Sequence, residues 1–551
     1  MMIRRLLKAI FEILSLRQTS IIGAAFVIMV TVFISRVLGL IRDRMLVARF
    51  SPDELGVYFA AFRLPNLVFE LLVMGAISAA FIPVFTDYLT EEKRKEAWQL
   101  ASSVINIGLL AFGLLAIPIF IFSWQVCRLI APGFNDSQLS QMVIFTRIML
   151  LAQVFPLIIG NFLTGISQSF KHFLIPSLAP VVYNLGIILG ILFLTPFLGL
   201  FGPVFGVVLG AILFMVVQIP LVRSLGFSHF WVLNFSHPGV REVGRLMLPR
   251  TFGLAVSQID TTVDLILSTL LGARMVTIFN FAQHLQQLPI GLFGVTIAQA
   301  ALPTMAQLKT KKNLEDFKNI FLSSMHQVLF LILPVSAILI VLRIPVVRLV
   351  FGASRFDWEA TVLTGKTLAL FSISLFAQAI IHLLVRGFYA LYDSKTPVVI
   401  GIIAVFINTV LSIFFVLVLK LPVWGLALST SIASIVNAIL LLLFLDWRVK
   451  KFNRIRLILP GLKMFIASFI TGIFLYVPMK LLDQLVFDTT RTINLIFLTG
   501  IATSIGLSVY LFLAWFLRIE EIVTFFNLAK KISRAPIRLI ETSQEVVNGG
   551  K

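Results

Sequence analysis

The 551-residue chain has little charge and almost no cysteine. Only 13% of its residues are charged, against about 25% in a typical globular domain, while 59% are hydrophobic. Cys127 is the single cysteine, which excludes an internal disulfide framework and a zinc site built of thiolates. A mean hydropathy of +1.01 therefore indicates a polytopic membrane protein.

Acidic residues are scarce as well: 25 Asp and Glu stand against 45 Lys and Arg, a net charge of +20. In a membrane protein this excess marks cytoplasmic loops that face anionic headgroups, so we expect membrane phospholipids and no nucleic acid as partners. The chain has no Gly-rich phosphate loop, no His-Glu-x-x-His motif and no nucleophile elbow. We therefore predict a transporter rather than an enzyme.

Long apolar runs dominate the sequence. About 20 apolar residues span a bilayer, and fourteen such stretches are centred near residues 33, 72, 110, 151, 185, 212, 258, 293, 333, 372, 405, 434, 470 and 504. Basic clusters fall on alternate sides of these stretches, which places both termini in the cytoplasm. The predicted fold is an all-α polytopic membrane protein with fourteen transmembrane helices.

The sequence also carries a weak internal repeat. Pro203 and Pro422 are 219 positions apart, Pro83 and Pro303 are 220 apart, and two Pro-Val-Val triplets are 217 apart. Such a repeat predicts two parallel six-helix lobes, an architecture of transporters. The predicted segments are an amphipathic interfacial helix (1–19), an N-lobe (20–228), a C-lobe (229–446), helices 13 and 14 (447–518) and a basic cytoplasmic tail (519–551).

The first apolar stretch contains charged residues that are costly inside hydrocarbon. At 100° per residue, one polar sector of this helix carries Ser35, Arg36, Arg42 and Asp43. Arginine binds phosphate through paired hydrogen bonds, so we predict that Arg36 and Arg42 meet an anion in a water-filled cavity. Arg44 and Arg49 lie closer to the outer interface, where their side chains can snorkel.

Other ionisable residues lie in the predicted helices. Asp260 and Asp264 are one helical turn apart, and two carboxylates at that depth need a cation, a proton or an arginine such as Arg250. Oxygen ligands favour an alkali or alkaline-earth ion over zinc. His284 is either a satisfied histidine of the bundle or a protonatable substrate contact, and Glu70 is a buried acid with no assigned partner.

Five motifs in order resemble the MurJ/MviN family of lipid II flippases, members of the multidrug/oligosaccharidyl-lipid/polysaccharide exporter superfamily. They are "SRVLGLIRD" (35–43), "FAAFRLPNL" (59–67), "GAISAAFIPVF" (75–85), "APGF" (131–134) and "RGFYALYDSKTPV" (386–398). The resemblance implies a flippase of the bacterial cytoplasmic (inner) membrane. It would carry lipid II, the polyprenyl-pyrophosphate disaccharide-pentapeptide, to the outer leaflet by alternating access. Helices 13 and 14 would form a groove for the lipid tail, and wall-synthesis enzymes are possible partners.

The resemblance also assigns residues. Ser35, Arg36, Arg42 and Asp43 match the helix 1 motif of the family. Asp264 matches a helix 7 carboxylate that binds sodium in some members, together with groups that correspond here to Asn408, Ser412 and Thr430. Ser412 stands where an aspartate is usual, so coupling to sodium or to protons is left open and no other cofactor is expected.

Three further positions depart from the family pattern: Phe69 and His284 replace arginines, and Gly56 replaces an acid. Arg63 or a protonated His284 are the candidates to substitute for the missing cavity arginines. The chain would then be a divergent flippase, or one adapted to a modified substrate. The alternatives are a flippase for another polyprenyl-linked glycan, a cation-coupled multidrug exporter, and a non-transporting scaffold for wall synthesis.

Overall fold

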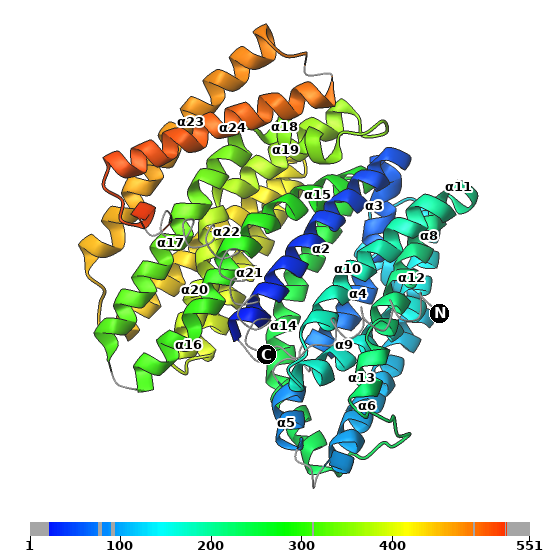
Figure 1. Cartoon of the computed structure of the whole chain (residues 1–551). Helices are drawn as coiled ribbons and strands as arrows, with labels where there is room; N and C mark the ends of the chain where they lie inside the picture. Colours follow the sequence, from blue (N-terminus) through cyan, green and yellow to red (C-terminus); the bar gives the residue numbers. More distant parts are fainter. Residues whose placement is uncertain are drawn as a thin grey trace, which may run out of the picture. The chain divides into compact units, whose positions relative to one another are not determined.

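The computed structural model describes residues 21–74, 80–89, 94–310, 313–488, 491–523 and 525, and within these ranges it consists of helices joined by loops, with no strand (Figure 1). The elements up to the middle of the chain are α2 (Ile21–Arg49), α3 (Pro52–Ala61), α4 (Arg63–Phe69), η1 (Glu70–Met74), α5 (Ile82–Asp87), α6 (Arg94–Ile121), α7 (Ser123–Ile130), α8 (Asp136–Ile148), η3 (Met149–Gln153), α9 (Val154–Ser169), α10 (Leu174–Leu189), η4 (Gly190–Leu194), α11 (Thr195–Leu198), α12 (Phe201–Val216) and α13 (Ile219–Ser224).

The remaining elements begin with the longest helix of the described residues. They are α14 (Pro238–Leu270), α15 (Ala273–Pro289), η5 (Ile290–Val295), α16 (Thr296–Thr310), α17 (Leu314–Val341), α18 (Arg343–Phe351), α19 (Trp358–Ile373), α20 (Leu375–Ala390), α21 (Lys395–Ile413), η6 (Phe414–Val418), α22 (Trp424–Arg448), α23 (Arg454–Leu485) and α24 (Thr492–Phe516). The predicted interfacial helix 1–19 lies outside the described residues, as does the tail from residue 526 onward.

The apolar helices are long enough to cross a membrane. Within the described residues eleven helical segments meet the length and hydropathy of a span, or twelve if α19 and α20, bent by 46° at their junction, form one. All fourteen predicted centres fall inside helical segments, including those in α2 and α14. The all-α membrane fold is therefore confirmed, while the count of fourteen spans stays a prediction.

The internal repeat reappears in the backbone. The described residues include wide π-helical turns, which often occur at functional positions of membrane helices. Two of them, η1 and η5, begin at Glu70 and Ile290, 220 positions apart. This offset equals the spacing of Pro83 and Pro303 in the sequence. The local backbone geometry thus supports the duplication that the sequence predicts.

The contacts divide the chain into two compact units. The first comprises residues 1–281, 350–364 and 405–429, and the second comprises 282–349, 365–404 and 430–551. These boundaries do not follow the lobes predicted from the repeat, which stay a prediction. In the second unit α23 and α24 lie side by side, and α23 also packs on α17 (Figure 1).

Within the first unit, α10 packs on α2 and on α12 (Figure 1). Glycines line the contact between α10 and α12: a Cβ on Gly186 would lie 2.4 Å from the Cα of Gly210, and one on Gly190 would lie 2.3 Å from the Cα of Gly206. Small residues allow membrane helices to approach this closely and gain dispersion contacts. The close packing fixes α10 and thereby the polar side chain that α10 presents to α2.

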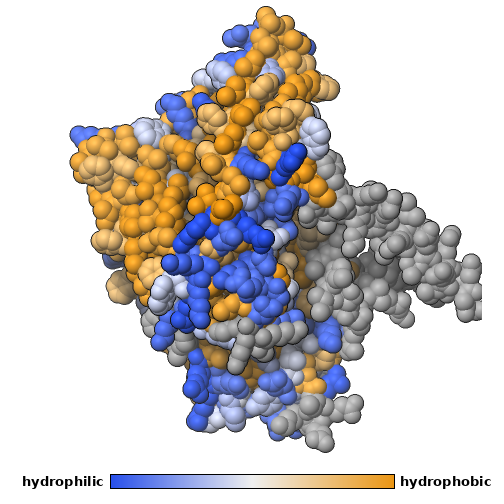
Figure 2. Space-filling view, turned by 90° about the vertical axis from the view of Figure 1, so that its left-hand side faces the viewer, coloured by the Kyte–Doolittle hydropathy of each residue, from blue (hydrophilic) through white to orange (hydrophobic). Residues whose placement is uncertain are grey.

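Large apolar side chains cover much of the surface, as one face shows in Figure 2. Leu114 on α6 and Phe469 on α23 are 67% and 66% exposed. A soluble protein rarely exposes apolar patches of this extent, whereas lipid tails solvate them without cost. The surface therefore agrees with a membrane-embedded chain.

Candidate functional site

Three of the four polar residues predicted on helix 1 share one hydrogen-bonded group. The Nε and Nη2 atoms of Arg42 donate to Oδ1 of Asp43 at 2.9 and 2.8 Å, and Nη1 donates to Oδ1 of Asn184 on α10 at 3.2 Å. Nδ2 of Asn184 donates to the hydroxyl of Ser35 at 3.1 Å. We call Ser35, Arg42, Asp43 and Asn184 the α2 network. Helical periodicity gave the first three, but Asn184 follows only from the packing of α10 on α2.

The α2 network contains unused hydrogen-bond donors on Arg42. A guanidinium has five N–H donors, and Arg42 uses three of them on Asp43 and Asn184. Among the described residues nothing accepts from the remaining two, one on each Nη atom. Because Asp43 is only 1% exposed and already balances the charge of Arg42, the pair is close to neutral. An anion would gain two hydrogen bonds here, and the net positive charge would have to come from elsewhere.

Arg36 is the candidate for that charge. It lies on α2 between Ser35 and Arg42 in sequence and its side chain is partly exposed. Arg36 therefore lies on the same helix as Ser35, Arg42 and Asp43, and its substrate-binding role stays a prediction.

Arg63, predicted to replace a missing cavity arginine, is engaged with α14. Its Nε and Nη2 donate to Oγ1 of Thr262 at 2.9 and 2.7 Å, and Nη2 also donates to the backbone carbonyl of Gln258 at 2.5 Å. The side-chain amide of Gln258 in turn donates to Glu70 of η1. Glu70 thus has a partner, and Arg63, which is buried, ties α4 to α14; its predicted role in substrate binding stays a prediction.

The two carboxylates of α14 meet polar groups of α21 and α22. Nδ2 of Asn408 donates to Oδ1 of Asp260 at 2.8 Å, and Asn408 and Ser412 lie close to the carboxyl of Asp264. Ser412 shares a 2.6 Å hydrogen bond with the hydroxyl of Ser429. We call Asp260, Asp264, Asn408 and Ser412 the carboxylate cluster. Three of the four predicted cation ligands, Asp264, Asn408 and Ser412, therefore do come together.

The carboxylate cluster contains buried oxygens that lack partners. Oδ1 of Asp264 and Oδ1 of Asn408 accept no hydrogen bond within the described part of the chain. An unpaired buried acceptor is costly, so such atoms usually mark an ion, a proton or a water. The described residues contain no group of three or more His, Cys, Asp and Glu suited to a metal. The donors are all oxygens, which suits a hard monovalent cation or a proton and not zinc.

Thr430, His284 and Phe69 are not members of the α2 network or of the carboxylate cluster as defined above. The hydroxyl that meets Ser412 is that of Ser429, while the predicted ligand Thr430 follows it on α22 and belongs to the second unit. His284 on α15 also belongs to the second unit. Phe69, at a usual arginine position, packs against the hydrophobic core of the first unit, so it has a structural role there.

Two glycines allow backbones to touch where α14 ends and α15 begins. A Cβ on Gly56 of α3 would lie 1.8 Å from the carbonyl oxygen of Ala273, and one on Gly133 would lie 1.9 Å from that of Thr269. No side chain fits at either position. We call these two approaches the glycine contact. The lack of space for a side chain explains why glycine, rather than an acid, occupies position 56. The spacing of residues in the sequence did not predict this contact.

An arginine with three acids lies beside the glycine contact. Arg274 pairs with Asp357, with Glu359 at 3.4 Å and with Asp53 at 3.8 Å. Burial raises the pKa of Asp357, but the N–H of Ala360 and the guanidinium of Arg274 outweigh it, so the pKa lies below its ordinary value. Asp53 lies in the first turn of α3, while Asp357 precedes α19 and Glu359 lies in its first turn, about 300 positions further along the sequence. We call Arg274, Asp53, Asp357 and Glu359 the Arg274 group. It connects a residue of the predicted N-lobe with residues of the predicted C-lobe, and all four residues belong to the first unit.

Comparison of the fold defines the class. The structure matches an inward-facing multidrug resistance MATE family transporter of the MOP superfamily with a TM-score of 0.63 at 16% identity, covering 76% of this chain and 94% of that one. An inward-closed structure of a lipid II flippase MurJ matches with a TM-score of 0.75 at 26% identity, covering 90% of this chain and 99% of the other. The chain therefore has the fold of these two transporter structures.

Sequence comparison then gives the family. The family model described as "Lipid II flippase MurJ" matches residues 54–493, so the chain belongs to that family. Similar proteins are the lipid II flippase MurJ of Burkholderia cenocepacia, 27% identical over 75% of this chain and 82% of the relative, and the probable lipid II flippase MurJ of Rhizobium meliloti, 29% identical over 86% and 90%. The protein is accordingly a multi-pass protein of the inner membrane.

Proposed function

We propose that this protein moves lipid II from the cytoplasmic to the outer leaflet of the inner membrane, with both termini in the cytoplasm. Membership of the lipid II flippase family supports the substrate. The observation that carries the mechanism is the α2 network, in which Arg42 is fixed by Asp43 and Asn184 and retains two unused N–H donors. A pyrophosphate offers acceptor oxygens at the spacing that such a guanidinium edge recognises.

Arg36 and Arg42 then have different tasks. Arg42 is neutralised by Asp43, so it orients the pyrophosphate through hydrogen bonds, while Arg36 supplies the net positive charge that attracts it. Once the anion is bound, an inside-negative potential favours its outward movement by about 2.3 kcal/mol per charge per 100 mV. The polyprenyl tail of the substrate, which makes no hydrogen bonds, would stay in lipid along helices 13 and 14.

The glycine contact and the Arg274 group support alternating access. Both connect residues of the predicted N-lobe with residues of the predicted C-lobe, at the helix ends that the basic loops place on the outer side. Such contacts close the outer side of the first unit. Opening toward the outer leaflet would have to break them, which costs little for exposed ion pairs and more for the close backbone packing.

The carboxylate cluster supports coupling to a cation. Asp260, Asp264, Asn408 and Ser412 would hold a sodium ion or share a proton, since two buried acceptor oxygens there have no partner among the described residues. A bound cation supplies the positive charge that lets both carboxylates remain ionised in a low-dielectric site. Contacts with wall-synthesis enzymes stay a prediction.

The experiment follows labelled lipid II in proteoliposomes. The rate at which the label becomes accessible from the far leaflet is measured with and without an inside-negative potential. The variants are Arg36→Gln, the double variant Arg42→Gln/Asp43→Asn, and Arg49→Gln as a control on the same helix. We expect the first two to lose most of the protein-dependent movement and the control to keep it.

Two results would overturn the proposal. If folded protein moves another polyprenyl-linked glycan but not lipid II, the substrate is wrong although the mechanism stands. If lipid II moves equally fast in the Arg36→Gln and double variants, the arginines serve the fold and the anion site is elsewhere. Replacing sodium by choline at constant pH, and then changing pH at constant sodium, tests the coupling separately.

A further inference from the structure

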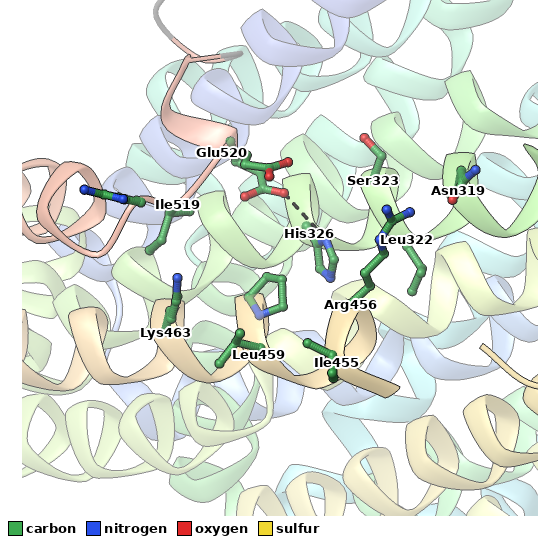
Figure 3. Close-up of a pocket in the computed structure, with 13 residues that line it drawn as sticks. Asn319, Leu322, Ser323, His326, Ile455, Arg456, Leu459, Lys463, Ile519 and Glu520 are labelled. Carbon is green, nitrogen blue, oxygen red and sulfur yellow. Dashed lines mark ion pairs between the residues drawn. The ribbon is translucent and has the colours of Figure 1, made fainter. Parts of the chain in front are cut away.

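A polar cavity of about 440 Å³ lies in the second unit, away in sequence from the α2 network and the carboxylate cluster. It is formed by the early part of α17, the start of α23 and the segment that follows α24 (Figure 3). The residues that decide its chemistry are His326, Arg456, Lys463, Arg518, Glu520 and Glu521. Nothing in the proposed transport mechanism uses them.

The end of α24 builds one wall of the cavity. Arg518 adopts a left-handed backbone with φ of 52°, and the N–H of Ile519 donates to the carbonyl of Ala514 at 2.9 Å. This pattern stops a helix and reverses the chain. Nζ of Lys463 donates to the carbonyl of Leu517 at 2.9 Å, which fixes α24 on α23. The segment after Arg518 is thereby held over the cavity.

The cavity combines cations with carboxylates that are not all paired. Nδ1 of His326 lies 3.5 Å from Oε1 of Glu521, so this carboxylate already has a partner. Burial raises the pKa of Glu521. Within the described residues, Arg456, Arg518 and Glu520 have no hydrogen bond or ion pair from their side-chain charges. Figure 3 shows Glu520 on the side of the cavity opposite the helix that carries Lys463 and Arg456. The cavity thus offers positive and negative groups across one small space.

An apolar stripe leads away from the cavity along α23. Ile455 and Leu459 line the cavity, and the following members of the stripe, spaced by three or four residues, are Leu462, Ile466 and Phe469. All five are exposed, Ile455 by 71%. Residues at this spacing lie on one face of a helix. A ligand with a charged head in the cavity could therefore lay a hydrocarbon chain on the stripe.

We propose that this cavity binds the headgroup of a zwitterionic aminophospholipid of the phosphatidylethanolamine type. The phosphate accepts hydrogen bonds from Arg456, Lys463 and Arg518, the primary ammonium donates to Glu520, and an acyl chain lies on the stripe of α23. The site belongs to the leaflet that the basic sequence around residues 447–456 predicts to be cytoplasmic.

The charge pattern distinguishes this headgroup from other lipids. Phosphatidylglycerol would bring a phosphate with no cation of its own, leaving Glu520 beside an anion. Phosphatidylcholine has a quaternary ammonium without N–H donors, so it cannot make the hydrogen bond to Glu520. Hydrogen bonds between charged groups are the stronger kind, and losing one typically weakens binding about tenfold.

The test titrates the full chain, in detergent, with dioleoyl phosphatidylethanolamine, phosphatidylglycerol and phosphatidylcholine, and counts bound lipids by native mass spectrometry. We expect phosphatidylethanolamine to bind about tenfold more tightly than the other two. Glu520→Gln should abolish this preference, while Arg456→Gln should weaken all three phospholipids. Asp483→Asn and Lys480→Gln, exposed charges at the other end of α23, are the matched controls and should change neither result.

Three outcomes would overturn the proposal: equal affinity for phosphatidylethanolamine and phosphatidylglycerol, a preference that survives Glu520→Gln, or displacement of the phospholipid by lipid II through the same residues. The headgroup comparison on the unaltered protein needs no variant, so a poorly folding variant leaves the test intact. Because binding is measured without transport, failure here is distinct from failure of the proposed flippase activity.

Discussion

The α2 network and the glycine contact lie in the same unit but use their atoms in opposite ways. In the α2 network, Arg42 keeps two donors unused after bonding Asp43 and Asn184. At the glycine contact, by comparison, backbones approach until no Cβ fits at Gly56. Unused hydrogen-bond donors suit a group that must bind and release a ligand. Close backbone packing suits a contact that holds one conformation.

Arg63 shows why this difference matters. In the sequence both are arginines in apolar segments: Arg42 matches the helix 1 motif of the family, and Arg63 is a candidate to substitute for a missing cavity arginine. In the structure three hydrogen bonds hold it on Thr262 and Gln258, and it is buried. By its contacts, Arg63 belongs with the residues that support the fold, and the variants below test that assignment.

The largest effect is expected from Arg42→Gln. It leaves Asp43 buried without its guanidinium, and breaking a buried ion pair in this way costs about 3–5 kcal/mol of unfolding free energy. Arg42→Gln/Asp43→Asn removes both charges and should recover most of that loss without recovering transport. Chemical unfolding in detergent measures both variants; equal stability of the two would mean that the pair is not buried as described.

A smaller loss is expected from Arg63→Lys. Lysine lacks the planar fork that reaches Thr262 and Gln258 together, so about 2 kcal/mol of unfolding free energy should be lost. The rate of lipid II movement per folded molecule should stay unchanged. If transport instead fails while the unfolding curve is normal, Arg63 contacts substrate, as the sequence predicts, and the comparison with Arg42 breaks down.

Gly56→Ala tests the glycine contact. The new Cβ meets the carbonyl of Ala273, and because that atom is backbone, the helices must shift, at a cost of about 1–3 kcal/mol. Gly39→Ala on α2 is the matched control, since a Cβ there meets nothing within 4 Å and alanine favours a helix by up to about 1 kcal/mol. Thermal unfolding of the two variants should therefore shift in opposite directions.

The smallest effect concerns pH. The folded-state pKa of Asp357 is lowered, so its contribution to stability is fully present above its unfolded pKa of about 3.9. That contribution is lost as the pH falls from there through the folded value. Thermal unfolding between pH 3 and 6 should show a slightly steeper acid loss in the unaltered protein than in Asp357→Asn. Identical profiles would mean that the Arg274 group contributes nothing to closing this side.

Much of the fold follows from the sequence because the bilayer restricts the choices. A chain in hydrocarbon must satisfy its backbone internally, so long apolar runs become helices and their centres can be read directly. Helical periodicity likewise places Ser35 near Arg42, and Asp260 near Asp264, as the structure has them. These are local properties, and local geometry requires only the order of residues.

Partners on other helices could not be predicted in the same way. Asn184 beside Arg42, Thr262 beside Arg63 and Ser429 beside Ser412 each depend on which helix faces which. A single polar residue in an apolar helix gives no periodic signal, so the sequence did not indicate that Ser429 meets Ser412, and Thr430 as a cation ligand stays a prediction. Distance along the chain does not constrain such pairs once the helices pack.

The sequence alone determined that this is a helical membrane protein with charges inside its first helix, since hydropathy and period are properties of single segments. Only the tertiary structure decided which of those charges are already satisfied. Arg63 is held by neutral groups on α14, Arg42 retains free donors, and Gly56 must be glycine. Hydrogen bonds and close packing form between segments distant in the chain, and no single segment encodes its neighbour.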